Sequence, residues 1–228
     1  MTTSKVVDYD PCIYLNGTPI QRTNKYKYLG VHIDDNLKYQ SHIINLDTKL
    51  SQFCGISYRL RNHFSPLSAK SYYYACVYSI LTYCICVWGG VMKCSRRADH
   101  LVKLQERIIR NIFHKYHREY TTCIFKTHKM LKLPDIHTLY IGIYMYKINK
   151  LNRCPTLNSN LNLSYPSHDY ETRRRNDLVL PFPRIETLRQ NYKYQCSNIW
   201  NEIPMHIRDS RTLSVFKKTL TQYLLDKY

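Results

Sequence analysis

The feature of this sequence that most constrains its fold is an uncharged, tyrosine-rich run from Tyr72 to Met92. The run is about as long as the roughly 20 apolar residues that a transmembrane helix needs. It nevertheless contains five tyrosines, two hydroxyl residues and the pair Gly89-Gly90, and it lacks a continuous Leu/Ile stretch. Because so long an uncharged segment must leave water, we expect a buried core helix here and no membrane partner.

Helix signals lie on both sides of this run. Apolar residues recur at helical spacing after Asn36, with Lys49, Arg59 and Arg61 on the outside: Ile43, Leu46, Leu50, Phe53 and Leu60. Ser65-Pro66 should open the helix that runs toward Gly89-Gly90, because serine caps free amides and proline loses nothing at the first helical position. Further helices should begin at Thr121, at Pro134-Asp135 and after the cap Thr212, the last with Leu213, Phe216, Leu220, Tyr223 and Leu224 inward.

The segment from Arg96 to Arg118 is expected to form the most regular amphipathic helix. At about 100° per residue, its apolar residues share one face: Leu101, Leu104, Ile108 and Ile112. A stripe of cations occupies the other face: Lys103, Arg107, Arg110, His114 and Arg118. A merely solvated face usually mixes signs, whereas this stripe contains no acid and Glu106 should lie to one side. Contact with a polyanion and an ordinary solvated face both stay open.

The N-terminal residues have the pattern of short strands. Asn16-Gly17 tolerates the positive φ angles of a tight hairpin, and the residues from Tyr26 to Ile33 alternate as in a strand. We therefore expect an α+β, mostly α fold, in which a small N-terminal antiparallel β-sheet precedes a helical bundle and a C-terminal helix. The expected divisions are 1–35, 36–151 and 152–228, the last beginning with a polar, linker-like stretch.

The charge balance restricts the partners of the chain. There are 34 Lys and Arg residues against 16 Asp and Glu residues, which gives a formal net charge of +18. Such an excess attracts nucleic acid or an anionic membrane surface, and an inert basic surface is the alternative. The nine cysteines include no CxxC pair, so a zinc site is not indicated. The first residues lack a secretory signal, so we expect an intracellular protein, nuclear or cytoplasmic, and not a secreted one.

Two adjacent carboxylates, Asp34-Asp35, follow an apolar run. Polymerases hold two metal ions with such a pair, but the carboxylates must converge from rigid elements on metals about 3.5–4 Å apart. Here the following residues turn helical, and the only acids upstream are Asp8 and Asp10. Acids before a helix favour its positive end and can cap its amides. We therefore expect a structural role for the pair, with no catalytic residue and no metal site in this chain.

Five segments carry a resemblance that continues along the chain. They are Tyr28-Leu29-Gly30, the run "SYYYACVYSILTYCICVWGG" ending in Trp88-Gly89, the helix "LVKLQERIIRNIF", the segment "YETRRRNDLVLPFPRIETLRQNYKYQCSNIWNEIP" and the terminal "SVFKKTLTQYLLDKY". In this order they resemble motifs of the reverse transcriptases of non-LTR (LINE-type, jockey-like) retrotransposons. These are the primer grip, a tyrosine-rich core helix, a Leu-Gln-x-Arg-x-x-Arg helix, a C-terminal segment and a closing helix.

The resemblance covers about residues 12 to 228 and implies a primer grip, a thumb-like bundle and a C-terminal segment. The family's endonuclease, fingers and palm should precede residue 1, so we expect a truncated copy or fragment that does not polymerise alone, and its standing as an enzyme is left open. Mg²⁺ belongs to the missing palm, and no cofactor is expected in this chain. The implied partners are RNA and RNA–DNA hybrid, with the missing fingers and palm as a further option. The implied binding residues are Tyr28, Leu29, Gly30, Lys103, Arg107, Arg110, Arg118, Arg173, Arg174 and Arg175.

Two other interpretations stay open. One is a helical protein-interaction module that docks on other polymerase domains or on a partner, and the other is a degenerate remnant without activity. A continuous basic groove favours nucleic acid, whereas scattered Lys and Arg around an apolar patch favour a protein partner. The sequence does not indicate an oligomeric state.

Overall fold

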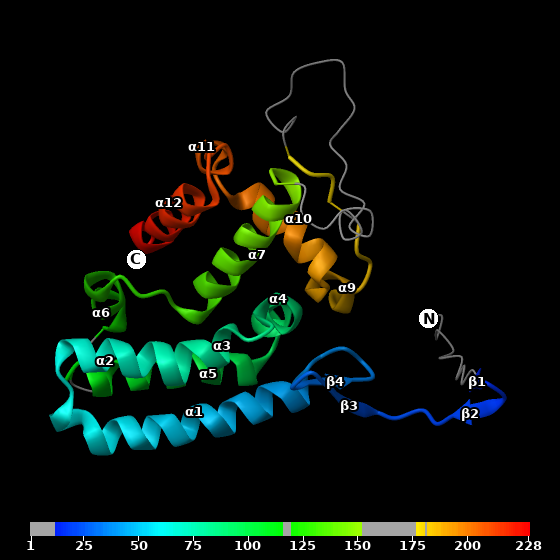
Figure 1. The fold of residues 1–228 in the computed structure, drawn as a ribbon, viewed down its shortest axis with the longest axis horizontal. Helices are drawn as coiled ribbons and strands as arrows, with labels where there is room; N and C mark the ends of the chain where they lie inside the picture. Colours follow the sequence, from blue (N-terminus) through cyan, green and yellow to red (C-terminus); the bar gives the residue numbers. More distant parts are fainter. Residues whose placement is uncertain (1–11, 116–119, 152–176, 181) are drawn as a thin grey trace, which may run out of the picture.

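The structure, a computed structural model, describes residues 12–115, 120–151, 177–180 and 182–228. In these ranges the chain is mostly helical, with two small antiparallel two-stranded sheets at the N-terminal end and a helix at the C-terminal end (Figure 1). The expected fold class is therefore confirmed.

The strands form two separate hairpins rather than one sheet. β1 (Ile13–Leu15) pairs with β2 (Thr18–Ile20) around Asn16 and Gly17, whose φ angles of 49° and 78° are those expected of this dipeptide. β3 (Lys25–Tyr28) pairs with β4 (Val31–Asp34). All residues of β1, β2 and β3 are exposed, and Figure 1 shows the first hairpin standing away from the helical body.

Helices α1 (Gln40–Leu60) and α5 (Arg96–Ile112) lie side by side and run parallel. Their contacts advance in the same direction along both helices, because Asp47 pairs with His100 and the Asn111 amide donates to Ser57 Oγ at 3.0 Å. The expected apolar face of α1 is buried as far as Leu50 and partly buried at Phe53. Leu60, the last residue of the expected series, is 42% exposed because it lies at the end of the helix.

The tyrosine-rich segment is not one helix, which corrects the expectation of an unbroken run. Ser65 caps it as expected, in a capping box with Ser68. It then proceeds through short pieces: α2 (Pro66–Tyr72), the π-helical η2 (Tyr73–Tyr78), α3 (Ser79–Thr82), α4 (Ile85–Trp88) and the 3-10 helix η3 (Gly89–Cys94). The break falls at Cys84, whose φ is 51°, and the indole of Trp88 donates to the Tyr83 carbonyl oxygen at 2.9 Å across it.

The membrane test gives a mixed result for this region. Among the described residues no single helix is long and apolar enough to cross a bilayer, whereas Pro66–Thr82 and Ile85–Met92, bent by 51°, pass together on length and composition alone. Tyr73, Val77 and Leu81 of this pair are buried inside the protein.

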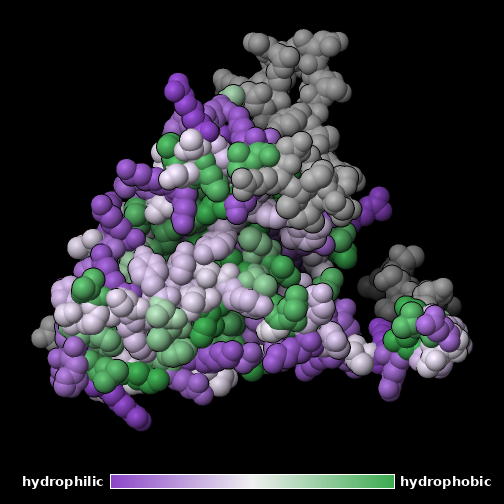
Figure 2. Space-filling model, viewed as in Figure 1, coloured by the Kyte–Doolittle hydropathy of each residue, from purple (hydrophilic) through white to green (hydrophobic). Residues whose placement is uncertain are grey.

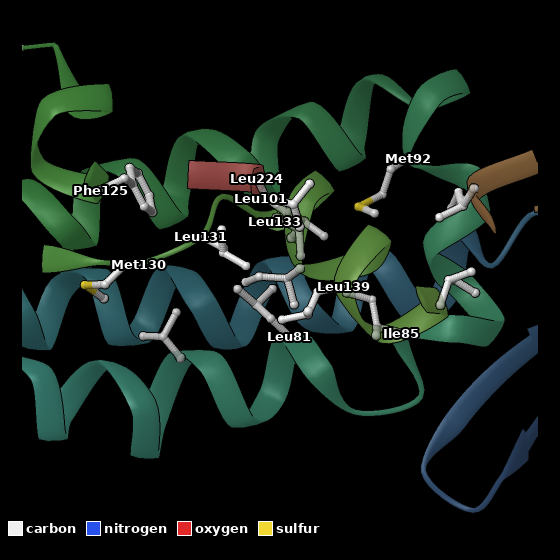
Figure 3. Close-up of a cluster of buried hydrophobic side chains, with 14 of the residues drawn as sticks. Leu81, Ile85, Met92, Leu101, Phe125, Met130, Leu131, Leu133, Leu139 and Leu224 are labelled. Carbon is white, nitrogen blue, oxygen red and sulfur yellow. The ribbon is translucent and has the colours of Figure 1, made fainter. Parts of the chain in front are cut away.

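Among the described residues, two of the later helices pack on α7. The remaining elements are the 3-10 helix η1 (Arg61–His63), α6 (Thr121–His128), α7 (Leu133–Asn149), α9 (Glu186–Gln190), α10 (Tyr192–Glu202), α11 (Met205–Arg208) and α12 (Leu213–Asp226). α7 contacts both α10 and α12, and Thr212 Oγ1 caps α12 by accepting from Val215 N, as expected. Figure 3 shows Leu81, Ile85 and Leu139, from α3, α4 and α7, meeting in the shared core.

Candidate nucleic-acid interface

The turn Tyr28-Leu29-Gly30 joins β3 to β4. Leu29 and Gly30 have φ angles of 45° and 84°, so two successive residues adopt the left-handed conformation that a tight two-residue hairpin turn requires. Glycine adopts it at no steric cost, whereas leucine rarely does. The Leu29 side chain is 72% exposed at the tip of the turn, and Tyr28 is 59% exposed.

Tyr83 holds this turn in place. Its hydroxyl donates a hydrogen bond to the Leu29 carbonyl oxygen, and a Cβ placed on Gly30 would lie 3.5 Å from the Tyr83 ring. One flank of the turn is therefore covered by the break in the tyrosine-rich segment. The side chains of Tyr28 and Leu29 stay accessible for a ligand.

Asp34 lies beside the start of α1. Its side chain is buried, and Oδ2 accepts a hydrogen bond of 3.4 Å from Ser41 N in the first turn of α1. Asp35 is exposed, and its backbone N–H donates to Asn24 O at 3.0 Å. Within the described ranges no group of three His, Cys, Asp or Glu side chains is placed to hold a metal ion.

The cationic stripe of α5 is shorter than expected. The helix ends at Ile112 rather than Arg118, because His114 adopts a φ of 55° and closes the helix. His114 N donates to Asn111 O and Lys115 N donates to Arg110 O at 2.9 Å, which together form a Schellman cap. His114 Nε2 lies 3.1 Å from Phe64 O, so the His114 ring is engaged with the protein. Of the predicted binding residues, Arg118, Arg173, Arg174 and Arg175 lie outside the described residues.

The three remaining cations of the stripe differ in exposure. Lys103 and Arg107 are exposed, whereas the Arg110 side chain is only 16% exposed. Glu106 flanks the stripe and contacts it at Arg110, because Glu106 Oε2 is 3.8 Å from Arg110 Nη2 and Oε1 is 3.9 Å from Lys132 Nζ. Arg110 is therefore part of a half-buried ion-pair network, although its Nε and Nη1 find no hydrogen-bond partner among the described residues.

A groove of about 590 Å³ lies between the C-terminal halves of α1 and α5. The described residues of its lining include four cations and no acid: Ser51, Cys54, Gly55, Tyr58, Arg61, Leu104, Arg107, Arg110, Asn111 and Lys115. Cys54 and Leu104 are the buried, apolar part of this lining. The groove thus combines an apolar floor with a positively charged rim. This arrangement suits an anionic ligand that also has a flat apolar part.

Two contacts organise the rim of the α1–α5 groove. The Arg61 guanidinium lies 4.8 Å over the ring of Tyr58, a cation–π arrangement on a side chain that is 58% exposed. Burial raises the pKa of the Cys54 thiol, and the Arg107 guanidinium, which hydrogen-bonds to this thiol, opposes the shift. Arg107 therefore lies beside the Cys54 thiol and is exposed to solvent.

The structure does not bring the turn and the cations into one site. β4 packs against the beginning of α1, whereas the groove borders the C-terminal half of that helix (Figure 1). At a rise of about 1.5 Å per residue, the two are separated by roughly 20 Å along α1. A ligand that contacts both must be extended.

The α1 side of the groove was not identified as a binding surface from sequence. Arg61 was expected on the outside of its helix, and Gly55 and Tyr58 carried no signal of their own. The only indication in the sequence is the helical spacing of Ser51, Cys54 or Gly55, and Tyr58, which places them on one face.

Comparisons with models of protein families, with curated proteins and with solved structures find no match for this chain.

Proposed function

We propose that this chain binds single-stranded RNA or RNA–DNA hybrid through the α1–α5 groove and the exposed cations of α5, without a polymerase centre of its own. The observation that carries this proposal is the lining of the groove, in which Arg61, Arg107, Arg110 and Lys115 gather, with Glu106 paired to Arg110 just outside the lining. Arginine and lysine neutralise phosphates and release condensed counterions, so affinity is largely independent of sequence and falls steeply with salt.

The motif resemblance supports the same assignment. In non-LTR retrotransposon reverse transcriptases, a thumb follows the primer grip and holds the template–product duplex. In this chain the Tyr28-Leu29-Gly30 turn has an exposed tip, and the α1–α5 groove lies roughly 20 Å away along α1. With nucleotides spaced by about 3.4 Å along a strand, that separation corresponds to roughly six nucleotides. A strand laid along α1 reaches both, as a primer grip and thumb acting together require.

The test is a titration of fluorescently labelled RNA and RNA–DNA hybrid at rising salt concentration, with wild-type protein and an Arg107→Glu variant. Arg107 is the appropriate position because it is exposed, whereas Arg110→Glu would place a second carboxylate beside Glu106 and disturb folding. We expect Arg107→Glu to weaken binding by about tenfold and to flatten the salt dependence by about 0.7 in slope for each lost single-strand contact.

Lys217→Glu is the matched control for this experiment. Lys217 is an exposed cation on α12, and its replacement changes the net charge by the same amount as Arg107→Glu. Binding by Lys217→Glu should stay within about twofold of wild type, because phosphate contact is local. Affinity that does not depend on salt, or equal weakening by the two variants, would exclude the groove as the phosphate-binding site.

A second candidate function is docking to another protein, which the first hairpin favours. Ile13, Leu15 and Ile20 are each more than half exposed, and Figure 2 shows the hairpin, with hydrophobic surface on it, clear of the body. A two-stranded hairpin in water is marginally stable by itself, so a surface that covers it would order it. Replacing Ile13 and Leu15 with Ser should abolish such docking, detected by pull-down with polymerase palm domains, and leave RNA affinity unchanged.

A further inference from the structure

The α1–α5 groove is open at Gly55, where a side chain could be present without disturbing the fold. Gly55 lies within the 21-residue helix α1, and its φ angle is not positive. A Cβ added there would meet no atom within 4 Å. Glycine in a helix interior is less favourable than alanine, so neither the backbone nor the packing accounts for it here. What Gly55 does provide is space at the middle of the groove.

We infer that the α1–α5 groove is a nucleotide pocket that receives one unpaired nucleotide of a nucleic-acid strand. This inference rests on the proposed function and adds a preference for single strands over duplex. The volume of about 590 Å³ lies within the range of about 300–1,000 Å³ that is usual for small-molecule sites. A paired base stays stacked inside its duplex, which then offers the protein only its backbone, whereas an unpaired base turns outward at little cost.

The phosphate and the base of a nucleotide would meet neighbouring side chains at one end of the pocket. Because α1 and α5 run parallel, Arg61 and Lys115 lie at one end and Ser51 and Leu104 at the other. The first end, together with Arg107, offers positive charge for the phosphate. Tyr58 offers an aromatic ring for the base, already covered on one side by the Arg61 guanidinium at 4.8 Å. A base on that ring would extend a cation–aromatic stack of the kind that binds single strands without sequence preference.

Hydrogen bonds at the floor of the groove join the two helices that form it. The Asn111 amide donates to Ser57 Oγ at 3.0 Å and to Cys54 O at 3.4 Å, so it links α5 to α1 beneath the rim. Leu50 and Leu104, about two turns earlier on the two helices, are buried. The helix pair therefore supplies most of the pocket, and Arg61 and Lys115 lie just beyond the ends of the two helices.

The decisive variant is Gly55→Leu, which fills the pocket without touching its charges. Gly55→Ala is its control, since one methyl group leaves most of the space open. The probe is a labelled single-stranded RNA of about eight nucleotides, compared with an RNA–DNA duplex of the same sequence. We expect wild type to bind the single strand about tenfold more tightly than the duplex. Gly55→Leu should remove that preference, and Gly55→Ala should keep it.

A second pair of variants tests the aromatic part of the pocket independently. Tyr58→Ala removes the stacking surface, and Tyr14→Ala removes an equally exposed tyrosine from β1, far from the groove. Tyr58→Ala should weaken single-strand binding by about tenfold and leave duplex binding unchanged, whereas Tyr14→Ala should change neither. Both positions are exposed, so circular dichroism spectra should match wild type for both variants.

The possible failures are distinguishable. Wild-type single-strand affinity that is retained in Gly55→Leu and Tyr58→Ala but lost in Arg107→Glu overturns the nucleotide pocket and leaves the proposed function standing. Equal wild-type affinity for single strand and duplex overturns the pocket as well. If wild type shows no salt-dependent binding to either nucleic acid, the proposed function fails, and the pocket fails with it.

Discussion

The amide nitrogen of Gln105 donates a hydrogen bond of 2.8 Å to the hydroxyl oxygen of Tyr73, and both side chains are almost completely buried. The same Nε2 donates to Leu131 O at 3.0 Å, while Oε1 accepts from Leu133 N at 2.9 Å. One glutamine therefore connects α5 to the π-helical turn and to the start of α7. The glutamine in the Leu-Gln-x-Arg-x-x-Arg segment thus serves the fold, whereas Arg107 lies on the groove.

Replacing Gln105 with Leu should lower the free energy of unfolding by about 2–4 kcal/mol, since a buried N–H, a carbonyl and a hydroxyl would lose their partner. Tyr73→Phe removes only one of these bonds and should cost about 1 kcal/mol. Urea denaturation followed by circular dichroism measures both. A Gln105→Leu variant as stable as Tyr73→Phe would show that water replaces the lost contacts.

We expect His42 to make the stability of the protein sensitive to acid. It is buried, its ring meets Trp88 edge-on at 5.7 Å, and neither ring nitrogen has a hydrogen-bond partner among the described residues. Burial, then His32 and Lys49, lower the pKa of His42 from 6.5 to about 4, and Asp34 opposes them. The folded state disfavours the charged ring. The contribution of the neutral ring to the free energy of unfolding is therefore complete above about pH 6.5 and is lost as the pH falls through about 4.

Unfolding free energies measured in urea from pH 7 to pH 4 should therefore fall by on the order of 3 kcal/mol on account of His42. A His42→Leu variant, which cannot be protonated, should show a shallower dependence over the same interval. An identical pH profile in the two proteins would assign the acid sensitivity to other groups.

We expect the stability of the protein in alkali to depend on Tyr228. Tyr228 Oη donates to Asp135 Oδ2 at 2.6 Å and accepts from Lys132 N at 2.7 Å. Burial first, and then the bond to Asp135, raise the pKa of the Tyr228 hydroxyl above 10. A raised pKa means that its stabilising contribution is complete below pH 10 and is lost as the pH rises further.

Tyr228→Phe should lower stability at pH 7 by about 1–3 kcal/mol, because Asp135 and the Lys132 amide lose a partner. The difference from wild type should shrink above pH 10, where the hydroxyl of the unfolded wild-type chain begins to ionise. Thermal unfolding at pH 7, 9 and 11 provides the comparison. A difference that stays constant up to pH 11 would contradict the role given to this hydroxyl.

Gly55→Ala should raise the free energy of unfolding by about 0.5–1 kcal/mol, because alanine is the better helix former and its methyl group meets no neighbouring atom. Differential scanning calorimetry should show the corresponding rise in melting temperature. Gly142→Ala is the informative contrast: its Cβ would lie 2.8 Å from a Leu220 methyl carbon, so this change should destabilise the protein.

Local chemistry in the sequence was sufficient to predict most of the elements. Ser65 and Thr212 cap the helices that they were expected to cap, and Asn16-Gly17 makes the expected hairpin turn. The spacing of Leu101, Leu104, Ile108 and Ile112 predicted the buried face of α5 correctly and left Lys103 and Arg107 on the outside. These predictions succeed because capping, turn conformation and amphipathic periodicity depend on residues a few positions apart.

Only the tertiary structure decided the end of α5, the break at Cys84 and the existence of the groove. Tyr83, beside the break, donates its hydroxyl to the Leu29 carbonyl oxygen of a hairpin distant in sequence. Lys132, which precedes α7, pairs with Glu106, and Glu106 also pairs with Arg110. The groove needs Gly55, Tyr58 and Arg61 beside Arg107, about fifty residues away along the chain. Periodicity shows which face of a helix is apolar, but not which helix will lie beside it, because that choice depends on packing between segments distant in sequence.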